Sequence, residues 1–159
     1  MRAQKAVYYF DNKTTGGMRT TGTSETAQTK KRIQALLREI AIARDGGCVL
    51  RDYPEAGMCG GYGPKSGTLI LQAEHLVSRA RSVSFGDMRN IVCLCQRHQG
   101  YFKEQNGRLY WELIEKIIGP ERWEWIKRVE RDQKSYPMGA SDWVKVKMAL
   151  KQELAEIAA

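Results

Sequence analysis

The stretch LQAEHLVSRARSVSFGDMRNIVCLCQRHQ, residues 71–99, most constrains what this chain can fold into. It contains both histidines of the 159-residue chain, His75 and His98, and two of its four cysteines, Cys93 and Cys95. Imidazole and thiolate groups are the ligands that zinc prefers. In a chain without a disulfide framework, Cys and His clustered in this way indicate a metal site. The sequence therefore predicts a fold organised around bound metal.

The composition favours a cytoplasmic protein that binds a polyanion. The first residues lack the apolar core of a signal peptide, and no apolar run reaches the roughly 18 residues of a membrane span, so we expect no membrane contact. The net charge of +8 favours nucleic acid as the partner, because Lys and Arg release counterions from a phosphate backbone. A basic protein that is merely kept soluble by its charge is the alternative that composition leaves open.

The chain divides into three segments, and together they predict an α+β fold. Residues 1–28 are rich in Thr, Gly, Ser and Lys, which is typical of a flexible arm. Residues 29–132 carry two short apolar runs of strand type, with helical periodicity before and after them. Residues 133–159 contain an amphipathic helix that Ser141 or Asp142 would cap, and its apolar face could pair two chains in a homodimer.

Helical spacing also decides how the tryptophans are interpreted. Trp111, Trp123 and Trp125 lie among Leu and Ile residues in two consecutive helical segments. Aromatic residues in that setting are usually core residues. We therefore expect them to pack inside the protein rather than to stack on bases.

Four residues are the expected ligands of a structural zinc ion: Cys48, Cys59, Cys95 and His98. Cys95 and His98 form a C-x-x-H pair with a spacing that lets both side chains hold one ion. Cys48 and Cys59 are separated by ten residues, which is longer than usual, but the turn-rich segment between them can bring its ends together. Cys93 is a competing ligand, although its apolar neighbours favour a buried thiol. Four unligated cysteines remain the other interpretation.

Glu74 and His75 combine a hard metal ligand with a general base at the end of an apolar strand. A histidine titrates near neutral pH and can accept a proton from water. A carboxylate can hold Mg²⁺ or Mn²⁺ against a phosphate. Arg79 and Arg81 follow closely and can bind phosphate oxygens bidentately. Alternation along a strand places Glu74 and His75 on opposite faces, so a shared role requires the backbone to bend there.

The order of these parts resembles that of the HNH endonucleases, the ββα-metal nucleases, and in particular the small phage and prophage HNH proteins with a structural zinc ion. A cysteine pair comes first, then LQAEHLVSR, then Asn90, and then an LC-x-x-H-Q stretch. The resemblance extends from about Ile40 to Ile118. It implies a small ββα-metal core with a zinc knuckle, flanked by helices on both sides.

The resemblance also implies a role for each matching residue. His75 takes the place of the general base, Glu74 that of the acidic ligand of a catalytic Mg²⁺ or Mn²⁺ ion, and Asn90 that of the residue that orders the loop between the strands. Gln99 falls where the family has a final histidine that binds the catalytic ion, and its amide oxygen could serve instead. In the alternative register His98 binds the catalytic ion, and zinc is left to Cys93 and Cys95.

These assignments predict a metal-dependent HNH endonuclease that hydrolyses DNA phosphodiester bonds inside a bacterial host cell. His75, Asn90 and Arg79 are the expected catalytic group. Four arginines are the expected contacts to the DNA backbone: Arg79, Arg81, Arg89 and Arg97. The replacement at Gln99 leaves two rivals: a catalytically weak or inactive zinc-dependent nucleic-acid-binding module, and a phage structural or assembly protein.

Overall fold

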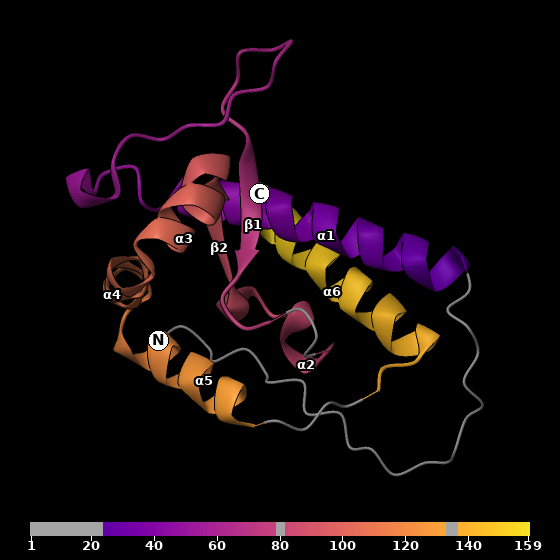
Figure 1. Cartoon of the computed structure of the whole chain (residues 1–159). Coiled ribbons are helices and arrows are strands. Elements are labelled where there is room, and N and C mark those ends of the chain that lie inside the picture. Colours follow the sequence, from indigo (N-terminus) through magenta and orange to yellow (C-terminus); the bar gives the residue numbers. More distant parts are fainter. Residues whose placement is uncertain (1–23, 79–81, 133–136) are drawn as a thin grey trace.

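The computed structural model describes residues 24–78, 82–132 and 137–159, and these residues form an α+β fold (Figure 1). Two antiparallel strands, β1 (Leu71–His75) and β2 (Ile91–Cys95), form a small sheet. The helices and helical turns around it are α1 (Ser24–Asp45), η1 (Pro54–Ala56), α2 (Ser82–Phe85), η2 (Met88–Asn90), the π-helical turn η3 (His98–Phe102), α3 (Lys103–Gln105), α4 (Gly107–Ile118), α5 (Pro120–Arg131) and α6 (Ala140–Ala158). Within these described ranges, no helix combines the length and the apolar character needed to span a bilayer.

Strand β2 is buried along its whole length because helices cover both faces of the sheet. Ile91 and Cys93 pack into one apolar cluster with α1 and α6, whereas Val92 and Leu94 pack into a second cluster with α4 and α5. A strand buried on both faces has a continuous apolar sequence, as IVCLC shows. The alternation along β2 thus divides the interior into two cores.

Helices α1 and α6 lie side by side and build the first core (Figure 1). Ile33, Leu37 and Ile40 of α1 are fully buried, and Trp143 of α6 packs into the same cluster. Helix α1 begins at Ser24, so residues 24–28 of the predicted arm are helical. The reason is that Thr29 lies on the buried face, one turn before Ile33, so the helix continues in the N-terminal direction. Residues 1–23 of the predicted arm lie outside the described residues.

Helices α4 and α5 cover the other face of the sheet. Trp125 is buried there, and the rings of Trp111 and Trp123 lie 6.0 Å apart against the same cluster. The prediction that these tryptophans are core residues is confirmed for Trp125, and Trp111 and Trp123 pack against the same core in half-buried positions. One apolar face of α6 packs against α1 within the chain, and Val144, Met148 and Ile157 of the same helix are exposed.

Two arginines join both helical layers to the start of β2. Arg44 at the end of α1 donates hydrogen bonds to the carbonyls of Met88 and Ile91 at 2.9 and 2.6 Å. Arg122 of α5, which is half-buried, donates to the carbonyls of Arg89 and Ile91. Charged donors to buried carbonyls make strong hydrogen bonds. The segment that leads into β2 is therefore fixed from two sides.

Candidate metal centre and strand-end pair

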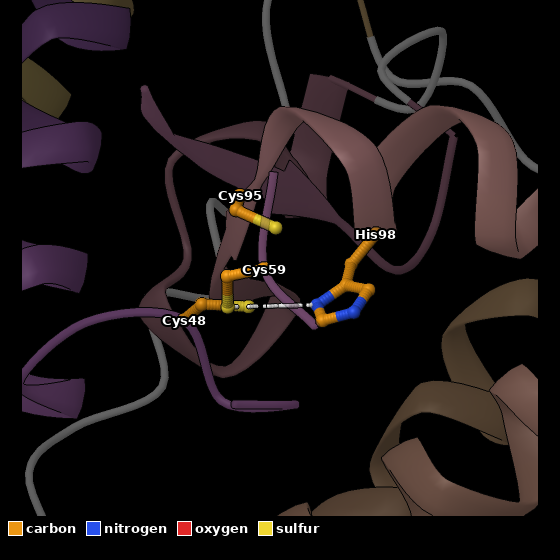
Figure 2. Close-up of side chains that lie close together, drawn as sticks. All are labelled: Cys48, Cys59, Cys95 and His98. Atoms are coloured by element: carbon orange, nitrogen blue, oxygen red, sulfur yellow. Dashed lines mark hydrogen bonds between the residues drawn. The ribbon is translucent and has the colours of Figure 1, made fainter. Parts of the chain in front are cut away.

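Cys48, Cys59, Cys95 and His98 come together in a single cluster, with one ligand atom from each residue and all four atoms within 4.8 Å of one another. Figure 2 shows the four side chains pointing toward a common centre. Ligand atoms around a tetrahedral zinc ion lie about 3.8 Å apart, given a Zn–S distance of about 2.3 Å. The predicted grouping is confirmed, and the cluster could hold a metal ion such as zinc.

Backbone hydrogen bonds between the turn-rich segment and the β-hairpin place Cys48 and Cys59 beside Cys95. The amide of Val49 donates to the carbonyl of Cys93 at 2.9 Å. The carbonyl of Gly60 accepts from the amide of Arg97 at 3.2 Å, on the C-terminal side of Cys59. The two ends of the long excursion are thereby fixed to the same end of β2, which explains how a ten-residue separation still yields a pair of ligands.

Gly61 allows this close approach. Its φ is +88°, and a Cβ atom there would lie 2.5 Å from the Cβ atom of Gln96. Glycine adopts positive φ without strain and has no Cβ atom. Only glycine therefore lets the Cys59 segment lie against the turn that presents Cys95.

Hydrogen bonding holds His98 in the tautomer that a metal requires. Its Nε2 lies 3.1 Å from the carbonyl oxygen of Ala56 and 3.2 Å from that of Gly57. A carbonyl only accepts, so Nε2 carries the proton and Nδ1 presents its lone pair. Nδ1 lies 3.2 Å from the sulfur of Cys48 (Figure 2). An imidazole whose other nitrogen donates to a backbone carbonyl is the usual arrangement of a metal ligand.

Burial adjusts the protonation of the cluster. It raises the pKa of the Cys48 and Cys59 thiols and lowers the pKa of His98. Burial also acts to raise the pKa of Cys95, but backbone hydrogen bonds from Gly60 and His98 together with hydrogen bonds from the Cys59 and Cys48 thiols outweigh it, so that the pKa of Cys95 falls below its usual value. A cation at the centre would stabilise the thiolate forms that burial alone disfavours. The ligand set therefore suits a cation that binds neutral imidazole and thiolate.

Cys93 lies apart from the cluster. It is fully buried in the core formed with α1 and α6, and burial raises its pKa to about 11. Cys95, by contrast, packs in the core on the opposite side. The two cysteines lie in separate cores although they are two residues apart, because β2 ends at Cys95 and the chain turns there into a helix. The C-x-C register for zinc finds no support in this geometry.

The Glu74 carboxylate contacts both Gln99 and Lys103. The amide Nε2 of Gln99 donates to Glu74 Oε2 at 2.7 Å, and Lys103 Nζ lies 2.5 Å from Glu74 Oε1. The Glu74 side chain is only 8 % exposed. Gln99 is the residue directly after the cluster ligand His98, so this contact joins the metal cluster to the end of β1. Lys103 was not anticipated from the sequence, although its place one turn after Gln99 is a signal that could have found it.

His75 points away from Glu74. Its Nε2 lies 3.0 Å from the carbonyl oxygen of Phe85, and its ring contacts the Phe85 ring with centroids 5.2 Å apart. Since a carbonyl only accepts, Nε2 carries the proton and Nδ1 is the basic nitrogen. Strand β1 continues regularly to His75, which pairs with Ile91. The backbone bend that would bring His75 and Glu74 to one side is therefore not present.

Asn90 fastens the chain that connects the two strands. It is fully buried, and its Oδ1 accepts from the amide of Val77 at 2.6 Å. Its Nδ2 donates to the carbonyls of Val77 and Ser84 at 3.2 and 3.0 Å. This is the loop-ordering arrangement that the resemblance implies for this asparagine.

The four arginines expected to contact DNA lie in different surroundings. Arg79 and Arg81 lie outside the described residues. Arg89 forms an ion pair with Asp87 at 2.6 Å and stacks on Trp125, so it serves the fold instead of presenting a free guanidinium. Arg97 is exposed, and its side chain lies against Gly57 and Gly60 beside the metal cluster.

Comparisons with family models, with curated proteins and with solved structures found no match to this chain. What can be said of its function therefore depends on the residues and their geometry.

Proposed function

We propose that this protein is a zinc-stabilised, metal-dependent endonuclease of the ββα-metal type that hydrolyses phosphodiester bonds in DNA. The contact between Glu74 and Gln99 carries the proposal. The two residues are far apart in sequence and are the pair that the resemblance assigns to one catalytic ion. Their side chains meet next to His98, with β1, β2 and the following helical turn in the order that a ββα core requires.

The cluster of Cys48, Cys59, Cys95 and His98 is the structural zinc site in this proposal. All four ligand positions are filled by protein groups, and three of the four residues are buried. A zinc ion with a closed tetrahedral ligand set stabilises a fold and leaves no position for water or substrate. The zinc therefore holds the turn that carries Gln99 and has no chemical step of its own.

His75 is the general base in the proposed reaction. The carbonyl of Phe85 fixes its ring and its tautomer, which leaves Nδ1 as the nitrogen that would accept the proton. Nδ1 is buried, so the attacking water would have to enter from the side of the ring that is open to the surface. Glu74 would hold the divalent ion, and the Gln99 amide would rotate to present its oxygen in place of its nitrogen. An ion bound there supplies positive charge that stabilises the phosphate in the transition state. Asn90 keeps the segment between His75 and β2 in place.

A second candidate is a zinc-dependent nucleic-acid-binding module without catalysis. Two observations favour it: Lys103 already neutralises Glu74, and Glu74 and His75 lie on opposite faces of β1. In that case the charge of +8 would serve binding alone.

Plasmid nicking with added Mg²⁺ or Mn²⁺ separates the two candidates. We expect the wild-type chain to nick supercoiled DNA and His75→Ala to lose this activity by a factor of about 10² or more, the usual contribution of a general base. Glu74→Gln should also be inactive. Glu112→Gln, an exposed carboxylate on α4 that pairs with Arg108, is the matched control and should keep full activity. Equal nicking by wild type and His75→Ala, with zinc content unchanged, would show that the catalytic assignment is wrong.

A further inference from the structure

A hollow on the surface between α1 and β1 contains His75 and is bordered by polar side chains. Its lining residues are Gln34, Arg38, Gln72, Ala73 and His75. Gln34 and Arg38 are exposed on α1, whereas His75 is 8 % exposed. Any substrate that reaches the His75 ring from this side must pass the side chains of α1.

We propose that this hollow binds the phosphodiester backbone of the nucleic acid and that Arg38 is its principal phosphate ligand. The assignment rests on the proposed function for the role of His75, and it adds a substrate-binding residue that the sequence did not indicate. The arginines expected to do this were Arg79, Arg81, Arg89 and Arg97, and Arg89 is already engaged with Asp87.

One nitrogen of the Arg38 guanidinium is held by a hydrogen bond, and the two terminal nitrogens are left to bind a ligand. Its Nε donates to the carbonyl of Leu71, the first residue of β1, at 2.6 Å. Among the described residues no carboxylate forms an ion pair with Arg38, so its charge is not neutralised within this part of the chain. A guanidinium fixed in this way loses little freedom when its terminal nitrogens bind phosphate bidentately.

Lys31 extends the site along α1. Lys31, Gln34 and Arg38 are exposed and follow one another at intervals of three and four residues, which places them on one side of the helix. Lys31 and Arg38 are separated by about 10 Å along the helix axis, which is roughly the rise of three nucleotides of one DNA strand. The two charges could thus hold the backbone on either side of a central phosphate.

The acidic residue next to Arg38 does not oppose this site. Glu39 borders a different groove, where Arg32 of α1 and Lys147 and Lys151 of α6 are its neighbours. The hollow at His75 therefore has a positive and polar lining, which suits phosphate and offers no pattern for reading bases.

Binding of a fluorescently labelled DNA duplex tests this assignment. The measurements are made in the His75→Ala background, so that cleavage does not interfere. We expect Arg38→Met to weaken binding about tenfold at 0.1 M salt and to reduce the slope of log K against log salt by about one. Arg38→Lys should keep the slope and recover part of the affinity. Arg108→Met removes the same charge from an exposed position on α4 and should leave both quantities unchanged.

Wild-type affinity and slope in Arg38→Met would overturn the assignment, and so would equal losses in Arg38→Met and Arg108→Met. A purely structural role for Arg38 would lower the thermal midpoint without the change in slope. If no variant or wild-type protein cuts DNA but Arg38→Met still weakens binding, the proposed endonuclease activity is wrong and the binding site stands.

Discussion

The metal cluster and the strand-end pair lie next to each other, yet their residues converge to very different degrees. In the cluster, one ligand atom from each of four residues lies within 4.8 Å of the others. In the strand-end pair, Glu74 and His75 are adjacent in sequence, but Glu74 contacts Lys103 on one side and His75 contacts Phe85 on the other. Turns can bring side chains that are distant in sequence to one point, whereas consecutive side chains of a regular strand point to opposite faces of the sheet.

The two regions also differ in how their charge is balanced. Burial raises the pKa of the Cys48 and Cys59 thiols, and the Arg51 guanidinium partly offsets this rise at Cys59. Glu74 already has the Lys103 ammonium group at 2.5 Å. An ion at the cluster would favour the thiolate forms that burial disfavours at Cys48 and Cys59, whereas the Glu74 carboxylate must give up its Lys103 partner before it can bind an ion. The following experiments, from the largest expected effect to the smallest, test this difference.

Removing a cluster ligand should have the largest effect. We expect Cys95→Ser and His98→Ala to lose the one zinc ion per chain and to lower the thermal midpoint by roughly 15 °C or more, because structural zinc contributes about 10 kcal/mol or more to folding. Metal analysis and thermal unfolding, with and without a chelator, measure both effects. Cys93→Ala is the matched control, and it should keep the zinc ion. Loss of zinc in Cys93→Ala with retention in His98→Ala would restore the alternative register.

Removing the Asn90 side chain should have the next largest effect. Asn90→Ala leaves a buried amide and two buried carbonyls without their hydrogen bonds, which should lower the free energy of unfolding by about 2–4 kcal/mol. Denaturant unfolding measures this loss. Asn106→Ala changes an exposed asparagine whose side chain makes no capping hydrogen bond, and it should cost less than about 0.5 kcal/mol. Similar losses in the two variants would mean that Asn90 does not order the loop.

Removing the Lys103 charge should have the smallest effect on the fold. It should, however, increase the affinity of Glu74 for a metal ion, the property in which the strand-end pair differs from the cluster. Lys103→Met frees one oxygen of Glu74 and removes a repelling charge, so we expect Mn²⁺ to bind at least tenfold more tightly, as followed by electron paramagnetic resonance. Lys116→Met is the control, because that ammonium lies over the Tyr53 ring. Unchanged Mn²⁺ affinity in Lys103→Met would show that the ion pair does not compete with a metal ion at Glu74.

Several features follow from the sequence because they depend on local pattern and chemistry. The α+β class follows from two apolar runs between helical periodicities, and the core role of Trp125 follows from its spacing. The metal cluster also follows, because few side-chain types bind zinc and this chain has few of them. Cys48 and Cys59 could be paired despite their long separation because the segment between them is rich in turns.

Other features were decided by the tertiary structure, because they depend on which elements pack together. No local pattern shows that Lys103 reaches Glu74 or that the carbonyl of Leu71 anchors Arg38 from the next layer. The placement of Cys93 and Cys95 in separate cores depends on where β2 ends and the chain turns. The sequence determines which groups are present and which chemistry they can perform. The packing of α1, α3 and the sheet determines which of those groups face one another, because contacts between distant residues form only when the elements that carry them bury their apolar faces together.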